Sequence, residues 1–552
     1  MSDLLRSSRR YRLWLVFLLC VQALAAPASA EGDEAFASAL AGLGSSSRTR
    51  MIEAVEQLAA LGDDRALPAL EALADRRLRV GPDGALYSLT SLVGGGEVVK
   101  RIPSLEIVSE PPPGLRKAKV NNRVKRAARG AIARLQLRAS DPAVRLAAAT
   151  KMRTQPSVES AELIRAALAE ETHANIAEAL RVALAQLQLE SESVELRLAA
   201  AETLGEFGDA GLAPQLRDRL QVDSEGHRPE TDSQVVRALE ASLAAIERRA
   251  SFIEFGANLF YGTSLASILC LAALGLAITF GLMGVINMAH GEMVMLGAYA
   301  TYVVQNLFLE YAPAHFDVYP LAAIPVAFMV VGAIGMAMER SVIRHLYGRP
   351  LETLLATWGI SLLLIQSVRL IFGAQNVEVA NPEWLSGGIE VAYGVVLPRS
   401  RIAIIAFAVI VVSTITFVLQ RTSLGLRVRA VTQNRAMAGA LGVSTHRVDM
   451  WTFGLGCAIA GLGGVALSQI GNVGPELGRG YIVDSFLVVV VGGVGKIVGT
   501  VWAAFGLGLL NKFLEPAVGA VFGKILVLVF IILFIQRRPQ GLFAQRGRAA
   551  EA

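Results

Sequence analysis

One long apolar stretch, residues 257–307, constrains the fold more than any other part of the chain. It is longer than the roughly 20 residues that cross a bilayer once, so it predicts two membrane helices. Its centre is nevertheless polar, because Asn287, His290 and Glu292 lie there among glycines. Lipid does not tolerate ionisable side chains or unpaired backbone groups, so we expect this centre to face protein or water. Two ordinary helices joined by a polar turn at the membrane surface are the alternative.

Composition divides the chain into two parts. Residues 31–250 are rich in Ala, Leu, Arg and Glu, whereas residues 256–536 consist of apolar blocks with short polar gaps. This contrast predicts a helical extramembrane domain over 31–250 and a polytopic membrane domain over 251–552. The net charge of +5 does not indicate nucleic-acid binding, because the arginines cluster beside membrane segments. None of the three cysteines lies in 31–250, so no disulfide is expected there.

The first 30 residues have the parts of a secretory signal peptide. Four arginines precede the short apolar run LWLVFLLCVQALAA, and residues 27–30 form an A-x-A-like cleavage site. An uncleaved anchor helix is the alternative, although the apolar run is short for that role. Both interpretations place the domain that follows in the bacterial periplasm.

Helical periodicity dominates residues 31–250. The residues Arg-Leu-Ala-Ala-Ala occur at 145–149 and again at 197–201, and a Leu-x-x-x-Gly-Asp pattern occurs at 58–63 and 204–209. Helix pairs of this kind bury their apolar faces against neighbouring pairs, so the pattern predicts an α-solenoid that resembles HEAT repeats. A plain helical bundle is the alternative.

Residues 80–114 depart from this pattern. Gly and Pro punctuate short β-branched runs there, which predicts a small strand-rich insertion or a long loop. The basic run 116–129 is interpreted as a solvated helix face. The domain has no ligand-spaced histidines, so no metal site is expected, and an interaction or scaffolding role is the default.

The membrane part contains eight apolar blocks. Arg-rich gaps follow the third, fifth and eighth blocks, and such loops stay in the cytoplasm. With the chain starting outside, eight full crossings would leave the basic C-terminal tail outside. The blocks are 257–283, 286–307, 319–338, 354–372, 402–419, 450–468, 485–510 and 518–536.

A glycine cluster in the seventh block resolves this conflict. The apolar run is interrupted by Gly492, Gly493, Gly495 and Lys496. If the block is re-entrant or discontinuous at this point, the number of full crossings becomes odd, and the basic C-terminal tail then lies in the cytoplasm. Two interrupted segments, one in each half, are typical of a transport pathway and of an internal two-fold repeat. The expected fold is therefore all-α, a polytopic bundle with broken or re-entrant segments after a HEAT-like domain.

The glycine cluster does not form a phosphate-binding loop. Val490 occupies the position of the first glycine, and Ile497 follows Lys496 where Ser or Thr is needed. His290 has no second histidine four residues away, so no zinc site is expected. We therefore expect neither an enzyme nor a cofactor, and an energy source in separate subunits.

The loop between the fifth and sixth blocks contains a short Ala-rich helix pattern with a Gly ending. Its small residues would allow close approach to a partner's groove, although an ordinary amphipathic connector is the alternative. The candidate contact residues are Asn434, Ala436, Gly439, Ala440 and Gly442.

These segments resemble the permeases of bacterial ABC importers for branched-chain amino acids and related solutes. Residues 421–467 are similar to the ATPase-coupling loop, and GLMGVINMAHGEMVMLGAYATY (281–302) is similar to the signature segment. Residues 471–516 and 523–544, with the helical extension, resemble the urea-type members most closely. The resemblance implies a multi-pass inner-membrane protein with its N-terminal domain in the periplasm. It also implies a second homologous permease, two cytoplasmic ATPase subunits and a periplasmic urea-binding protein.

A urea pathway needs a few hydrogen-bonding groups in an apolar tube. Asn287, His290 and Glu292 are the expected lining residues; helix capping by Asn287 and pairing of Glu292 with a partner's basic residue are the alternatives. Thr279, Asn472 and Glu476 are further candidates near segment ends.

Two other functions stay open. A branched-chain amino acid or small-amide permease is the first, and a zwitterionic solute would need charges that Lys496 with Glu292 could supply. A membrane-anchored helical-repeat scaffold is the second, and the broken segments and the coupling loop argue against it.

Overall fold

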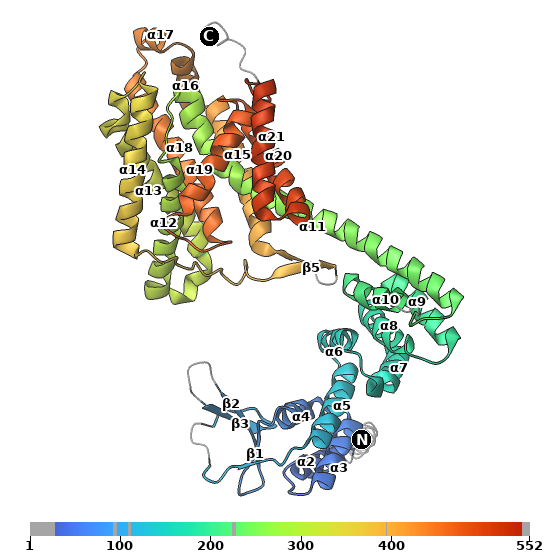
Figure 1. Cartoon of the computed structure of the whole chain (residues 1–552). Helices are drawn as coiled ribbons and strands as arrows, with labels where there is room; N and C mark the ends of the chain where they lie inside the picture. Colours follow the sequence, from blue (N-terminus) through green and yellow to red (C-terminus); the bar gives the residue numbers. More distant parts are fainter. Residues whose placement is uncertain (1–27, 92–96, 109–111, 223–227, 393–394, 544–552) are drawn as a thin grey trace, which may run out of the picture. The chain divides into compact units, whose positions relative to one another are not determined.

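The computed structural model describes residues 28–91, 97–108, 112–222, 228–392 and 395–543. The chain forms two compact units, Met1–Ala250 and Ser251–Ala552 (Figure 1). Helix α11 (Ser233–Met283) contains the boundary between them. The predicted signal peptide falls on residues 1–27, outside the described residues, apart from 28–30, which begin α2 (Ala28–Gly42).

Three helices and a 3-10 turn recur in the first unit at a fixed distance along the chain. Each element of one set begins 52 residues after its counterpart in the other. The earlier set is α5 (Asn122–Arg138), α6 (Pro142–Thr154), η2 (Val158–Ser160) and α7 (Ala161–Glu170), and the later set is α8 (Ala174–Gln188), α9 (Val194–Phe207), η3 (Ala210–Leu212) and α10 (Ala213–Leu220). The same order occurs earlier in α3 (Arg48–Leu61), η1 (Asp64–Ala66) and α4 (Leu67–Ala74).

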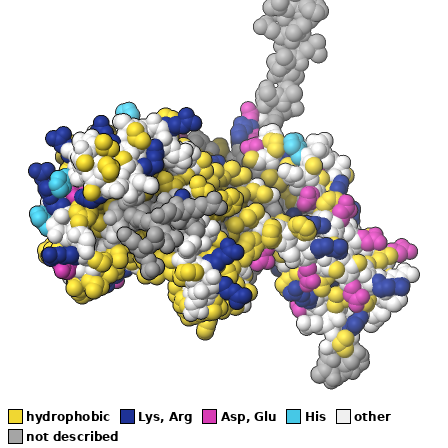
Figure 2. Space-filling view, turned by 90° about the horizontal axis from the view of Figure 1, so that it is seen from above, with side chains coloured by type: hydrophobic (Ala, Val, Ile, Leu, Met, Phe, Trp, Pro, Cys, Tyr) yellow, Lys and Arg dark blue, Asp and Glu magenta, His cyan; other side chains and the backbone are white. Residues whose placement is uncertain are grey.

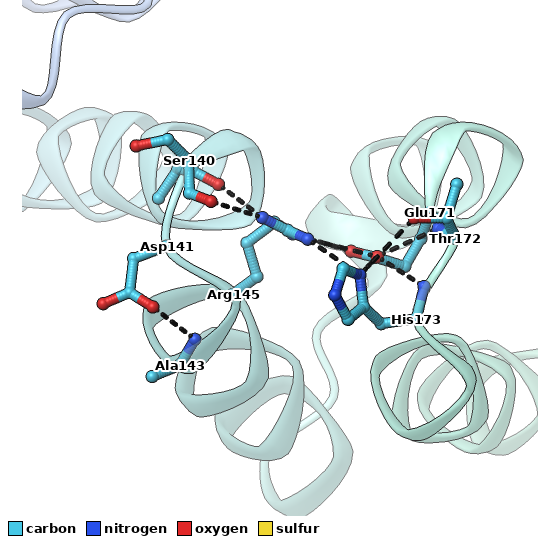
Figure 3. Close-up of polar contacts among 8 residues, drawn as sticks. Ser140, Asp141, Ala143, Arg145, Glu171, Thr172 and His173 are labelled. Atoms are coloured by element: carbon cyan, nitrogen blue, oxygen red, sulfur yellow. Dashed lines mark hydrogen bonds and ion pairs between the residues drawn. The ribbon is translucent and has the colours of Figure 1, made fainter.

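An arginine joins consecutive elements within the earlier set (Figure 3). The Nη1 group of Arg145 donates to the carbonyl oxygens of Ala139 (2.8 Å) and Ser140 (3.1 Å), which follow α5. Its Nε group donates to Glu171 at 2.8 Å, just after α7. The hydrogen bonds from Arg145, followed by those from the backbone at His173, lower the pKa of Glu171 to about 2.

The later set repeats this arrangement with Arg197, 52 residues on. Its Nη1 group donates to the carbonyl oxygens of Ser191 and Glu192, both at 2.9 Å, and its Nε group donates to Glu230 at 2.8 Å. The repeated Arg-Leu-Ala-Ala-Ala sequence therefore marks equivalent helix starts. A relationship to HEAT repeats stays a prediction.

Four short strands lie between α4 and α5. They form an antiparallel sheet in the order β3-β2-β1-β4, in the region where the sequence predicts strands or a loop. Arg116 and Lys117, which we expected on a helix face, form the edge strand β4 instead, because they pair with β1. The strands are β1 (Leu78–Val80), β2 (Leu86–Ser91), β3 (Glu97–Ile102) and β4 (Arg116–Lys117).

The second unit is a bundle of apolar helices. Among the described residues, seven helices are long and apolar enough to cross a membrane, which confirms the all-α polytopic fold. They pack around buried apolar clusters shared by α11, α13 and α18. After α11 come α12 (His290–Tyr311), α13 (Tyr319–Ser341), α14 (Pro350–Phe372), α15 (Arg399–Arg421), α16 (Ser423–Gln433), α17 (Arg435–Ala440), α18 (Thr445–Ser468), α19 (Leu477–Gly492), α20 (Ile497–Val518) and α21 (Ala520–Arg537). The short elements are η4 (Pro313–Val318), η5 (Ile343–His345) and the hairpin of β5 (Gly388–Ala392) and β6 (Val395–Pro398).

Helix α18 packs against its neighbours through glycines. A Cβ on Gly275 of α11 would overlap the carbonyl oxygen of Gly456, and a Cβ on Gly297 of α12 would overlap that of Gly461. The backbones of these helices are thus in direct contact.

The seventh apolar block consists of two helices, α19 and α20. The turn between them contains Gly493 (φ +97°) and Gly495 (φ +82°), and Leu542 after α21 donates its backbone N–H to Val491 (2.8 Å). Helix α17 and the end of α21 lie at the same end of the unit, opposite β5 (Figure 1). In the view onto that end, Lys and Arg side chains are more frequent than Asp and Glu (Figure 2). Entry of this break into the membrane stays a prediction.

Candidate functional site

The first residues of α12 lie within the bundle. Helix α11 ends at Met283, and Gly284 (φ +70°) turns the chain into a non-helical link over 284–289. His290 then begins α12, and its Nε2 donates to the carbonyl oxygen of Ala272 in α11 (2.8 Å). Nearby Gly275 packs on Gly456, which is halfway along α18. The link therefore brings polar residues to the middle of two long apolar helices.

Two polar atoms at this point have no partner among the described residues. Asn287 is 2% exposed and accepts a hydrogen bond from the Ala289 N–H (3.0 Å), but its Nδ2 is unpaired. His290 is fully buried, and its Nδ1 is unpaired. An unsatisfied buried polar group costs about 1–3 kcal/mol. A donor and an acceptor are thus available to water or a small solute.

Helix α14 contributes hydroxyl groups beside the link. Thr357 Oγ1 accepts from the backbone N–H of Met288 (3.1 Å), and Ser361 lies close enough to Glu292 to interact with its carboxylate. Glu292 is 3% exposed, and Arg479 of α19 lies close enough to interact with it electrostatically. The site therefore combines one buried carboxylate with several neutral hydrogen-bonding groups.

A second helix start meets the first. Gly291 and Gly478 are the second residues of α12 and α19, and a Cβ on either would overlap the backbone of the other. The first N–H groups of a helix lack intrahelical acceptors, and they carry the positive end of its dipole. Two such ends in contact favour a solute group that accepts hydrogen bonds.

The remaining predicted pathway residues lie elsewhere. The hydroxyl of Thr279 is buried and lies within 3.4 Å of carbonyl oxygens of its own helix, so it is already paired. Asn472 is exposed in the link between α18 and α19. Glu476 in the same link pairs with Arg369 at 2.6 Å, and its side chain is 59% exposed.

The glycine cluster is separate from Glu292 in the described contacts. Gly492, Gly493 and Gly495 form the turn between α19 and α20, and Lys496 is exposed directly before α20. A Cβ on Gly281 would overlap Gly495, so this turn packs on the last residues of α11. The charge found beside Glu292 is Arg479, and a pairing with Lys496 is not among the contacts of the described residues.

The predicted coupling residues form a short exposed helix. Asn434 caps α17 by accepting from the Met437 N–H (2.9 Å). Ala438 is buried, whereas Met437 and Leu441 are 58% and 79% exposed. Gly442 has φ +85° and ends the helix. The exposed positions also include Ala436, Gly439 and Ala440.

Our sequence reasoning missed Thr357, Ser361, Gly478 and Arg479. The sequence of α14 does contain a pattern that could have revealed its polar face. Hydroxyl residues recur there every four positions, at Thr353, Thr357 and Ser361, and all three are buried. No comparable signal marks Gly478, since one glycine among many does not reveal which backbone it touches.

Comparison with known proteins adds a family match. The family described as branched-chain amino acid transport system / permease component matches residues 258–535, about half of the chain. The permease protein BraD of a high-affinity branched-chain amino acid transport system from Pseudomonas aeruginosa is 29% identical over 294 residues, which are 52% of this chain and 95% of BraD.

Two further relatives are slightly less similar. LivH of Salmonella typhimurium is 27% identical over 300 residues, 53% of this chain and 97% of LivH. The ribose import permease RbsC of Escherichia coli is 28% identical over 124 residues, 21% of this chain and 39% of RbsC. No solved structure matches.

Proposed function

This chain belongs to the family of branched-chain amino acid transport permeases, and from that premise we propose that it is the urea-translocating subunit of a bacterial ABC importer. As a multi-pass membrane permease it is a transporter component and not an enzyme. We propose both that urea is the solute and which partner proteins the chain assembles with.

The observation that supports urea is the pair of unpaired atoms at the link before α12. Asn287 Nδ2 is a donor that suits a carbonyl oxygen, and His290 Nδ1 is an acceptor that suits an amide N–H. Urea offers both groups within one small neutral molecule. The helix starts at Gly291 and Gly478 add the positive ends of two helix dipoles, which also favour a carbonyl oxygen.

A branched-chain amino acid is the second candidate solute. The relatives are named for these amino acids, and Glu292 with Arg479 offers one charge of each sign near the site. In that case the ammonium and carboxylate groups would need both side chains, whereas urea needs neither charge.

The exposed apolar residues of α17 support docking of ATPase subunits at this end of the bundle. The full importer would contain a second homologous permease, two ATPase subunits and a periplasmic urea-binding protein. We place the N-terminal helical unit in the periplasm, where the delivery protein is its proposed partner. A scaffold without transport is the competing function.

Labelled solute uptake tests this proposal. Cells that lack other routes for urea are compared with and without the chain, and unlabelled leucine and urea serve as competitors. We expect saturable urea uptake that depends on the chain and is reduced only by urea. Uptake of leucine but not urea would favour the amino-acid permease, and uptake of neither would favour the scaffold.

A further inference from the structure

Arg435, the first residue of α17, is held by two other elements of the membrane unit. Its guanidinium forms an ion pair with Asp449 of α18, whose side chain is 4% exposed. The same guanidinium lies 4.8 Å from the ring centroid of Tyr347, in the link between η5 and α14. A planar guanidinium can pair with a carboxylate and stack on a ring at the same time, which lysine cannot do.

The contact continues into α13. The hydroxyl of Tyr347 donates to Oε1 of Glu339 at 3.3 Å, and Glu339 is 3% exposed in the last turns of α13. A continuous polar chain therefore runs from α17 to α13 and α18. These two helices are in direct contact, since Gly335 of α13 packs on Cys457.

A second, weaker contact lies between α16 and α11. Thr432 Oγ1 lies 3.3 Å from the carbonyl oxygen of Leu282 and 2.8 Å from that of Val428 in its own helix. Leu282 is in the last turn of α11, two residues before Gly284, where the link to Asn287 begins. Motion at Thr432 would therefore reach the residues that hold the proposed solute site.

A cavity of about 190 Å³ separates these attachments. Leu282, Thr432, Arg435 and Asp449 are among its lining residues. Close-packed interiors transmit displacement rigidly, whereas a gap lets one element shift against another. The cavity therefore leaves free space where the α16–α17 segment faces the end of α11 and the start of α18.

We propose that Arg435 and Thr432 are positioning residues that transmit displacement of α17 to α18 and to the link before α12. This inference rests on the proposed import function and assigns the residues that connect ATP hydrolysis to the solute site. Contiguous networks of packed and hydrogen-bonded groups are the physical means of such coupling.

The test measures ATP hydrolysis and labelled urea uptake together, in vesicles that contain the complete importer. For Arg435→Ala we expect at least a tenfold rise in ATP hydrolysed per urea transported, with hydrolysis itself retained. Arg427→Ala, an exposed arginine of α16, should leave the ratio unchanged. Exchange of the charges in Arg435→Asp with Asp449→Arg should lower the ratio again.

Thr432→Val provides a milder variant that keeps the shape of the side chain. A severalfold rise in the ratio is expected for it. Equal losses of hydrolysis and uptake in Arg435→Ala, or an unchanged ratio in both variants, would overturn the inference. If the wild-type importer transports leucine and not urea, the urea assignment fails, and the same ratio measured with leucine decides the role of Arg435.

Discussion

Gly291 and Gly478 touch through their backbones, each one residue into its helix. The two helices lie almost two hundred positions apart in the chain, yet they start at the same point in the bundle. Because α12 and α19 both begin there, the positive ends of their helix dipoles meet next to His290. This junction is the structural basis for the proposed pathway.

The junction should not tolerate a methyl group. Gly291→Ala or Gly478→Ala places a Cβ against the backbone of the other helix, so we expect uptake to fall at least tenfold and stability to fall by about 1–3 kcal/mol. Gly480→Ala is the matched control, because a Cβ there has open space. Uptake within twofold of wild type for both junction variants would contradict the close approach.

The exposed helix α17 should respond to side-chain size. A Cβ at Gly439 meets nothing within 4 Å, so Gly439→Ala should keep uptake, whereas Gly439→Trp should abolish it by blocking a partner. Gly442→Val should also lose uptake, because a β-branched residue at φ +85° destabilises this turn by about 1–2 kcal/mol. Uptake, the amount of protein in the membrane and co-purification of ATPase subunits are measured. Normal uptake in Gly439→Trp would refute the coupling role.

Much of the membrane unit could be predicted because apolar length is a local signal. The blocks that contain α13, α14, α15 and α18 are each long, apolar and bounded by polar residues, so composition locates them. The start of α19 at Leu477 was missed, because Arg479 and Gly478 interrupt the apolar pattern. The polar centre at 287–292 was visible, but the residues facing it from α14 and α19 depend on packing between distant segments.

The repeat of the first unit was only partly visible for a similar reason. Arg145 and Arg197 share a local sequence, but their partners Glu171 and Glu230 follow at different distances, 26 and 33 residues. The loop before α11 is longer than the loop before α8, so equal spacing fails at that point. The equivalence of the two ion pairs therefore appears only in the structure.

The first unit should lose stability in acid. The pKa of Glu171 is lowered to about 2 from a usual value of 4.5, so its charged form stabilises the folded state. That contribution is complete above about pH 4.5 and disappears as the pH falls towards 2. Glu171→Gln should therefore speed hydrogen exchange in residues 122–220 at pH 7, with a difference from wild type that shrinks in acid.

An exposed pair serves as the control for this measurement. Glu162 pairs with Arg165, but its side chain is 85% exposed, and exposed pairs contribute about 0–1 kcal/mol. Glu162→Gln should thus leave exchange nearly unchanged. A pH-independent difference for Glu171→Gln would show that the carboxylate charge does not stabilise the unit.

The charge at the two ends of the bundle predicts on which side of the membrane the C-terminus lies. The last residues of α21 lie at the end that carries α17, and basic residues gather there, which indicates the cytoplasm. A reporter enzyme fused after Ala552 should be active only in its cytoplasmic form. A reporter placed in the hairpin of β5 and β6 should be active only in its periplasmic form, and the reverse pattern would invert the topology.

Uptake of labelled urea by vesicles with the complete importer, comparing Asn287→Ala and His290→Ala with Asn306→Ala, tests the central claim most directly. Asn306 lies in α12 away from the junction and is only partly buried. We predict at least a tenfold loss of ATP-dependent uptake for the two junction variants and near-normal uptake for the control. Equal, near-normal uptake in all three would contradict a solute route through the meeting point of α12 and α19.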